Sequence, residues 1–255
     1  FRSAPVASHQ LSFSGSSDKT SYYASVNYLN QDGVVISSGL KRYGALINLN
    51  HSIKKFNFGL NLNTSLVKDD FVKNGTDVNS GAGVIISALQ MDPSLPVFNS
   101  DGGYSIHSSI DVDNPVAIAN TWQDNMETNR TFGTLFAEYS ILDNLKAKVN
   151  FGSDRQFSRR DEYITKADTR AGLQTNGRAF INDAERTNYL TEFTLNYSKQ
   201  INSDHTINAL AGYTYQVFNG RGFSASAVDL PTDAYLTNNI TAGNPSRYNI
   251  GSNKF

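Results

Sequence analysis

The sequence predicts an all-β protein whose strands form an antiparallel up-and-down transmembrane β-barrel. Three observations lead to this prediction. Several segments alternate apolar and polar residues with a period of two, which is typical of strands with one apolar face. The connections between these segments alternate between short and long along the chain. Charged residues within the segments fall on the polar positions, and only His51, at a strand end, lies on the apolar side.

The composition narrows the class of protein. The chain has 255 residues and a net charge of -1, so no overall field attracts it to nucleic acid. It contains no cysteine, which excludes disulfides, thiolate metal ligands and a cysteine nucleophile. No stretch approaches the roughly 18 consecutive apolar residues of a membrane helix. The strands of a membrane β-barrel fit this composition, because only one of their faces is apolar.

The alternation predicts four strands in the first part of the chain, of which 56–66 is the clearest. Phe58 and Leu60 lie on its apolar row, and Asn57 and Asn61 on its polar row. At about 3.3 Å per residue, a strand of this length tilted by about 45° just crosses a hydrocarbon layer. Weaker alternation before it predicts strands at 9–14, 20–30 and 43–51.

Four more strands are predicted in the second part of the chain. In the segment 145–152, the apolar row holds Val149 and Phe151, whereas Lys146 and Lys148 lie on the other row. This separation matters because a Lys or Arg facing lipid near mid-bilayer costs roughly 2 to 4 kcal/mol. The other three segments with this alternation are 131–141, 188–198 and 207–217.

The lengths of the connections indicate how the strands are arranged. Tight turns at 15–19, 52–55, 142–144 and 201–204 alternate with long connections at about 31–42, 68–130, 155–186 and 219–255. Short turns at one end and long loops at the other are typical of outer-membrane barrels, in which the long loops are extracellular. A soluble β-sandwich need not sort its loops by length.

The polar rows predict the lining of the barrel. Nine polar side chains are expected to face the lumen: Asn57, Asn61, Asn63, Glu138, Lys146, Lys148, Asn150, Glu192 and Asn196. Five apolar side chains interrupt these rows, and we expect them to contact a plug inside the barrel: Leu29, Leu46, Phe136, Leu190 and Leu210. Contacts of this kind favour a plugged transporter over an open porin.

The chain is expected to be a piece of a larger barrel. The segment 219–255 shows no convincing strand, since the alternate positions before the final Phe255 are Asn253, Gly251 and Asn249. Polar rows rich in Asn, Ser, Thr and Gly are typical of the wet or plugged lumen of a large barrel.

Several short segments, taken in order, resemble the early barrel region of the SusC/RagA-type TonB-dependent transporters. The resemblance extends over nearly the whole chain and keeps the family order. The segments are Phe1-Arg2-Ser3-Ala4-Pro5, Asp18-Lys19-Thr20-Ser21-Tyr22-Tyr23, Tyr28-Leu29-Asn30-Gln31-Asp32-Gly33, Ala88-Leu89-Gln90-Met91-Asp92-Pro93, Asn114-Pro115-Val116-Ala117 and Leu210-Ala211-Gly212-Tyr213.

The resemblance implies a plugged barrel of about 22 strands in the outer membrane of a Gram-negative bacterium. It also implies import of oligosaccharides or oligopeptides, driven through the TonB complex, with a SusD-like surface lipoprotein as a lid. The plug domain, the energy-coupling segment and the C-terminal strands are not found, so residues 1–255 are all expected to belong to the barrel domain. The alternatives are a passive porin, a component of a secretion complex and, less favoured, a soluble carbohydrate-binding β-protein.

The loop 68–130 carries further predictions. Residues 80–91 are expected to form a short helix capped by Ser80, and residues 96–104 a hairpin turn. Four aromatic residues in predicted loops are candidates for contacts with a ligand or with the lid, although each can equally belong to a small loop core: Trp122, Phe98, Tyr104 and Tyr163.

No catalytic or cofactor site is predicted, and the chain is not expected to be an enzyme. Neither a His-Glu-x-x-His zinc motif nor a Gly-x-Ser-x-Gly elbow is present. Asp111 and Asp113, or Asp101 with Asn99, offer oxygens to Ca²⁺, but no run supplies the six to eight oxygens that Ca²⁺ needs. Turn chemistry is the preferred explanation, so no metal is assigned.

Overall fold

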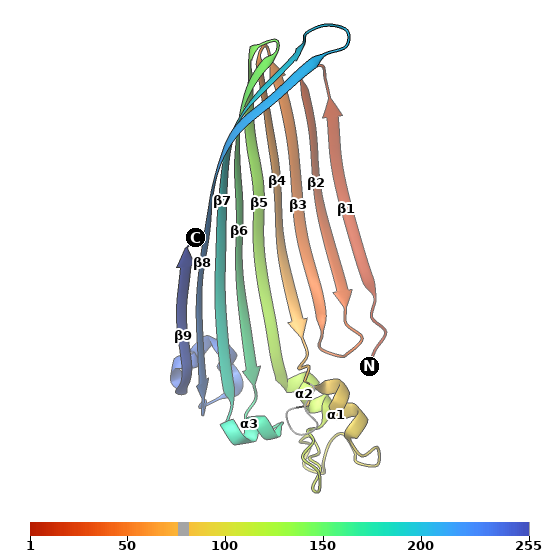
Figure 1. Ribbon diagram of the computed structural model, residues 1–255. Coiled ribbons are helices and arrows are strands. Elements are labelled where there is room, and N and C mark those ends of the chain that lie inside the picture. Colours follow the sequence, from red (N-terminus) through yellow and green to blue (C-terminus); the bar gives the residue numbers. More distant parts are fainter. Residues whose placement is uncertain (76–81, 255) are drawn as a thin grey trace.

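The computed structural model describes residues 1–75 and 82–254. Within these residues one antiparallel sheet contains nine strands in sequence order (Figure 1). Each strand pairs with the next along the chain, which confirms the predicted up-and-down arrangement. The strands are β1 (Val6–Ser16), β2 (Thr20–Asp32), β3 (Gly39–Ile53), β4 (Phe56–Phe71), β5 (Trp122–Leu142), β6 (Leu145–Ile164), β7 (Arg178–Gln200), β8 (Thr206–Val228) and β9 (Asn244–Lys254).

Short and long connections gather at opposite ends of the sheet. The short turns follow β1, β3, β5 and β7 and lie at the upper end in Figure 1. The long connections lie at the lower end, together with the helices α1 (Val84–Gln90), α2 (Pro115–Thr121) and α3 (Arg170–Thr175) and the 3-10 segment η1 (Asp233–Ala242). We call this lower end the loop end of the sheet.

The prediction that the segment 219–255 contains no strand is wrong, because β9 lies in it and adds a ninth strand to the eight that the alternation predicts. The apolar residues of β9 are Tyr248 and Ile250, which pair with Ala225 and Phe223 of β8. The residues that argue against a strand in the sequence, such as Asn249 and Gly251, belong to the opposite face of β9. Counting back from the last residue therefore selects only the polar row.

The long connections are shorter than predicted. They comprise residues 33–38, 72–121, 165–177 and 229–243, in place of 31–42, 68–130, 155–186 and 219–255. Trp122 therefore begins β5 and Tyr163 lies in β6, so the prediction that both are loop residues is wrong. Near the loop end both faces of the strands carry polar residues, as with Asp124 on one face of β5 and Glu127 on the other. Hydropathy alternation disappears there although backbone pairing continues.

The connection between β4 and β5 contains the predicted helix in part. Helix α1 has Gly83 as its N-cap residue with no side-chain cap bond. Ser80, the expected cap, lies outside the described residues. In α2, Asn114 caps the first turn by accepting hydrogen bonds from the backbone of Val116 and Ala117. The predicted hairpin at 96–104 is confirmed by the pairing of Phe98 with Tyr104.

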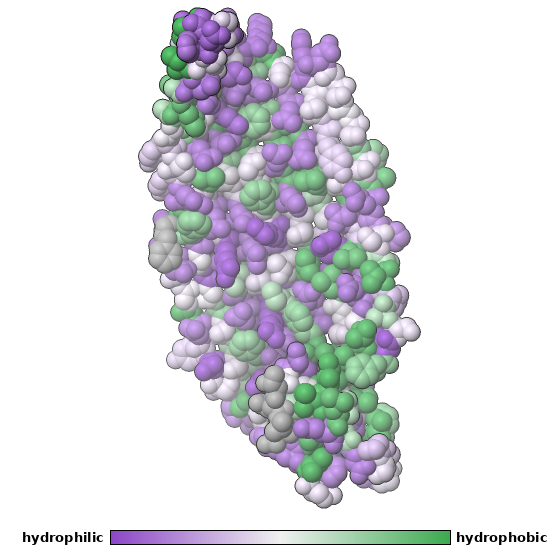
Figure 2. All heavy atoms as spheres, turned by 45° about the vertical axis from the view of Figure 1, so that its right-hand side comes forward, coloured by the Kyte–Doolittle hydropathy of each residue, from purple (hydrophilic) through white to green (hydrophobic). Residues whose placement is uncertain are grey.

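Two small hydrophobic cores lie at the loop end. One contains Val35, Val84, Ile118 and Ala119, and the other contains Tyr163, Ala179 and Leu230. In Figure 2, hydrophobic side chains gather at the lower end of the molecule, whereas hydrophilic side chains are interspersed over the strands above. No helix in the described part of the chain is long and apolar enough to cross a membrane.

Candidate functional site

The register of the sheet places the predicted apolar rows on one face. Residues directly opposite each other in an antiparallel pair point to the same side of the sheet. Leu60 of β4 pairs with Leu49 of β3 and with Leu135 of β5. Phe193 of β7 pairs in the same way with Tyr213 of β8. We call this side the apolar face and the opposite side the polar face.

The nine residues predicted to face a lumen all lie on the polar face, where several of them contact one another. Lys146 Nζ lies 3.4 Å from Glu138 Oε1, which joins β6 to β5. Asn150 Nδ2 donates a hydrogen bond of 3.3 Å to Glu192 Oε2 on β7. The residues on this face, read from the strand pairings, are Asn57, Asn61, Asn63, Glu138, Lys146, Lys148, Asn150, Glu192 and Asn196.

The five residues predicted to contact a plug also lie on the polar face. They are Leu29, Leu46, Phe136, Leu190 and Leu210. Leu210 is 70% exposed, whereas the other four are partly covered by neighbouring side chains. Lys148 Nζ lies 4.3 Å from the centroid of the Phe136 ring, within the range of a cation–π contact. Apolar and charged groups therefore alternate along this face.

Three arginine–carboxylate pairs cross the polar face near the loop end, and we call them the loop-end ladder: Arg130 with Asp154, Arg160 with Asp124, and Arg178 with Glu162. Arg130 binds Asp154 through two hydrogen bonds, of 2.9 Å from Nε and 2.8 Å from Nη2. Arg160 Nε donates at 2.6 Å to Oδ1 of the buried Asp124. Such bidentate pairs fix the orientation of both side chains.

A groove of about 380 Å³ lies beside the ladder. Arg178 and Glu162 form one side of it, and Arg247 of β9 also lines it. Arg247 has no carboxylate partner among the ion pairs of the described residues. Phe180 and Ser226, which pair across β7 and β8, complete the lining together with Ser246 of β9. The groove thus offers both charges and an aromatic ring to a molecule on the polar face.

Trp122 is part of this wall. Its Nε1 donates a hydrogen bond of 3.2 Å to Glu162 Oε1, the oxygen that also accepts from Arg178 at 2.6 Å. Lys73 Nζ lies 4.0 Å from the centroid of the indole ring. The indole also packs against the core that contains Ile118. Its surroundings are therefore largely those of a structural residue.

The other aromatic candidates differ in exposure. Tyr163 is 1% exposed, and its hydroxyl donates a hydrogen bond of 2.7 Å to Asp233 in η1. Phe98 is 53% exposed and lies over Tyr104 with ring centroids 5.1 Å apart. Of the four candidates, Phe98 presents the most accessible ring, while Tyr163 is held in a small core.

The acidic pair considered for Ca²⁺ has a different partner. Arg170 Nε lies 3.1 Å from Asp111, and the Arg170 backbone donates a hydrogen bond of 2.8 Å to Asp113. Burial raises the pKa of Asp113, while the hydrogen bond from Arg170 and the charge of Lys73 oppose that rise. In the described ranges, no three His, Asp or Glu residues gather closely enough to hold a metal ion.

The loop-end ladder is absent from the sequence prediction because its residues lie outside the predicted strands, and all of them except Asp154 lie in segments predicted as loops. The alternation of residues along the strands nevertheless contains the information needed to find these pairs. Continuing the polar row of β5 back from Phe136 in steps of two reaches Arg130 and then Asp124. The same count along β6 from Asn150 reaches Asp154 and Arg160. Continuing the polar rows past the ends of the predicted strands therefore identifies the residues of the arginine–carboxylate pairs.

Sequence comparisons relate the chain to TonB-dependent receptors. No protein-family model matches the chain. TonB-dependent receptor P3 of Formosa agariphila is 34% identical over 259 residues, a match that covers 97% of this chain and 25% of the relative. TonB-dependent receptor P26 of the same organism is 28% identical over 250 residues, with 96% and 24% covered. The chain spans about a quarter of the length of the curated relatives it matches.

Solved structures share the fold. The structure of the RagAB peptide transporter aligns with a TM-score of 0.80 at 20% identity, covering 98% of this chain and 28% of that chain. The RagAB peptide importer in its closed-closed state aligns with a TM-score of 0.77 at 21% identity, covering 98% and 29%. The chain is therefore similar in sequence to about a quarter of the length of TonB-dependent receptors, and it shares its fold with the corresponding part of the RagAB structures.

Proposed function

We propose that this chain forms part of the wall of an active importer in the outer membrane of a Gram-negative bacterium. Its apolar face contacts lipid, and its polar face lines the lumen. The observation that carries this proposal is the register, which brings the apolar rows of successive strands onto one face. The charged rows of β5 to β7 lie on the other face over the same length. This separation avoids the cost of charges facing lipid.

The polar face fits a plugged barrel better than an open pore. Phe136 and Leu190 pair with Asn150 and Gly152 in the middle of the wall. An apolar side chain that stays exposed to water contributes no stability. An apolar side chain packed against a plug is buried, which stabilises the protein by roughly 25 cal/mol per Å² of apolar surface. The nine polar residues on this face line the remaining lumen, and the five apolar ones contact the plug.

The proposed substrates are oligosaccharides or oligopeptides, and the proposed partners are a SusD-like lid lipoprotein and the TonB complex. The RagAB structures are named for a peptide transporter and a peptide importer. The curated relatives are named TonB-dependent receptors. In this chain, the exposed Phe98 and its neighbour Tyr104 are the aromatic residues best placed to contact a substrate or the lid. Coupling to TonB uses residues outside this chain.

Spin labels test which face meets lipid. The chain contains no cysteine, so single cysteines at Leu60 and Asn61 label neighbouring positions on opposite faces. In the full-length protein reconstituted in vesicles, we expect the label at Leu60 to collide with dissolved oxygen and to be shielded from a water-soluble nickel complex. The label at Asn61 should show lower accessibility to oxygen. The reverse pattern would remove the proposal.

Uptake measurements test active import. Cells that express the full-length protein are given mixed oligopeptides or oligosaccharides, with and without a protonophore that collapses the proton gradient. Energy-coupled import stops when the gradient is lost, whereas diffusion through a porin continues down the substrate gradient. Uptake that persists at its full rate would favour the porin alternative.

A further inference from the structure

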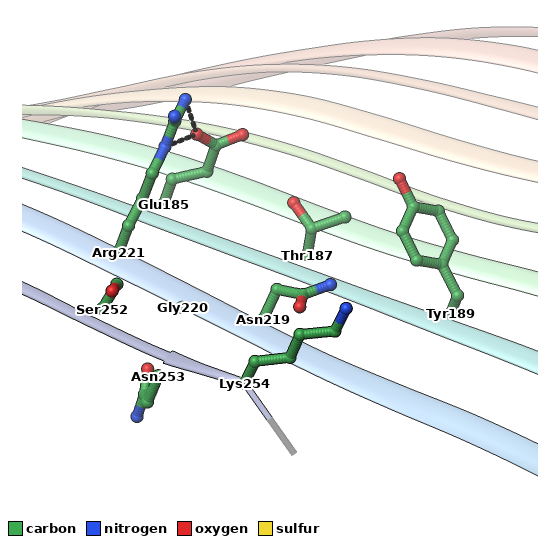
Figure 3. Close-up of a pocket in the computed structure, with 9 residues that line it drawn as sticks. All are labelled: Glu185, Thr187, Tyr189, Asn219, Gly220, Arg221, Ser252, Asn253 and Lys254. Atoms are coloured by element: carbon green, nitrogen blue, oxygen red, sulfur yellow. Dashed lines mark hydrogen bonds and ion pairs between the residues drawn. The ribbon is translucent and has the colours of Figure 1, made fainter.

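The apolar face carries a compact charged cluster near the loop end. Arg155 Nη2 lies 2.9 Å from Glu185 Oε1, and Arg221 Nε lies 2.6 Å from Glu185 Oε2. Figure 3 shows Glu185, Arg221 and Lys254 on the neighbouring strands β7, β8 and β9. We call Arg155, Glu185, Arg221 and Lys254 the rim cluster. Three positive groups and one negative group leave it with a net charge of +2.

The rim cluster interrupts the apolar face, with Tyr189 and Val217 on the side of the short turns and with Phe223 and Ile250 on the side of the loop end. Tyr189 of β7 pairs with Val217 of β8, and Glu185 pairs with Arg221, four residues further toward the loop end. At about 3.3 Å per residue and a tilt of about 40°, this step raises Glu185 roughly 10 Å above Tyr189 along the membrane normal. The inference rests on the proposed function in one respect, that the apolar face meets lipid. The aromatic residues Phe157, Tyr189 and Phe223 lie around the cluster on this face, as is typical of the membrane interface where the lipid headgroups lie.

The two arginines are available to a further anion. Their side chains are 64% and 75% exposed, whereas that of Glu185 is only 15% exposed. Each guanidinium has five N–H donors, and Glu185 accepts only part of them. The carboxylate therefore holds both guanidinium groups in place while their outer donors stay free. A groove of about 520 Å³ lies next to them, lined in part by Tyr189, Asn219 and Lys254.

We propose that the rim cluster binds the phosphate group of an anionic membrane lipid. Guanidinium groups bind phosphate in bidentate geometry, and Lys254 adds a positive charge to the groove that Arg221 lines. A lipid is favoured over a free phosphate because Tyr189, which lines the groove, belongs to the apolar row and pairs with Val217 of the next strand. Acyl chains attached to the bound phosphate lie along those rows, so one molecule uses both parts of the surface.

Native mass spectrometry tests this proposal. The full-length protein in a neutral detergent is titrated separately with phosphatidic acid, with diacylglycerol and with inorganic phosphate. We expect phosphatidic acid to bind more tightly than either of the other probes. The double variant Arg155→Gln/Arg221→Gln should bind phosphatidic acid roughly thirty-fold more weakly, since each surface cation near a membrane contributes about one kcal/mol.

Matched variants make the test specific. Arg186→Gln removes one charge at the position next to Glu185 but on the polar face, and it should leave lipid binding unchanged. Arg221→Lys keeps the positive charge but not the bidentate geometry, so its loss of affinity for phosphatidic acid should be intermediate. This variant replaces the double variant in the test if the double variant fails to assemble. Equal lipid binding by wild type and the arginine variants would overturn the proposal. So would inorganic phosphate that binds as tightly as phosphatidic acid.

The failure of this inference is distinguishable from the failure of the proposed function. If the spin label at Leu60 meets lipid and the arginine variants still bind phosphatidic acid normally, only the headgroup site is wrong. If the label at Leu60 is shielded from lipid, the membrane assignment of the whole apolar face is wrong.

Discussion

The ring of Phe136 covers the backbone of Gly59 on the neighbouring strand. The two residues are directly paired across β4 and β5, and a Cβ added to Gly59 would overlap the ring. Gly59 is buried and lies near the start of the long strand β4. A glycine weakens a strand, and an aromatic ring packed over it restores part of the lost contact. This pair therefore sets the position of one of the five predicted plug contacts.

Replacing Gly59 is expected to destabilise the barrel. In Gly59→Leu the new side chain displaces the Phe136 ring, and overpacking of this kind costs roughly 1 to 3 kcal/mol. Unfolding of the full-length protein from vesicles by urea measures the loss. Gly152→Ala is the control on the same face, because the nearest atom to its Cβ is 3.5 Å away. Equal stability of both variants would show that Phe136 moves aside freely.

The loop-end ladder predicts an asymmetric response to mutation. The side chain of Asp124 is 7% exposed and that of Arg160 is 44% exposed. Arg160→Gln leaves a buried carboxylate without its cation, which is expected to cost about 3 kcal/mol. Asp124→Asn leaves an arginine that water can reach, and we expect about 1 kcal/mol. Urea unfolding of both variants measures whether Arg160→Gln loses more free energy of unfolding than Asp124→Asn. An equal or reversed order would show that the burial of Asp124 is unimportant.

An exposed pair on the other face provides the control for this comparison. Lys68 and Glu127 lie 3.0 Å apart with both side chains more than half exposed, at 52% and 54%. Surface ion pairs contribute roughly 0 to 1 kcal/mol. Lys68→Gln should therefore change the free energy of unfolding by less than Arg160→Gln.

The sequence predicts the strands well only where one face meets a uniform apolar environment. The row through Phe58 and Leu60 alternates because opposite faces have different surroundings. Toward the loop end, Asp124 lies on the polar face and Glu127 on the apolar face, so the alternation ends while the strand continues. The pairing of Arg160 with Asp124 joins residues 36 positions apart. Such contacts follow from the register, which hydropathy alone does not give.

The hairpin at residues 96–104 predicts a local effect on substrate or lid binding. Phe98 is 53% exposed, and truncating an exposed aromatic at an interface commonly costs more than 1 kcal/mol. In Phe98→Ala, we expect roughly tenfold weaker uptake at limiting substrate concentration. Leu89→Ala, in α1 of the same connection and 79% exposed, is the matched control. A similar loss in both variants would point to general loosening of the connection.

The contact between Asp113 and Arg170 predicts a pH dependence of the loop end. Burial raises the pKa of Asp113 above its ordinary value, although the hydrogen bond from Arg170 acts against this shift. A carboxyl with a raised pKa binds more protons in the folded state than in the unfolded state. Its contribution to stability is therefore fully present below the ordinary pKa and is lost as the pH rises through the raised one.

Amide hydrogen exchange of the full-length protein measures this dependence at the Arg170 N–H, which donates to Asp113. After correction for the intrinsic exchange rate, protection in the wild type should fall as the pH rises from about 4 toward neutrality. Asp113→Asn keeps the accepting oxygen and removes the titration, so its protection should vary less over the same range. If both proteins show the same pH profile, the carboxyl of Asp113 does not control the stability of this contact, and the cause must lie in other titrating groups.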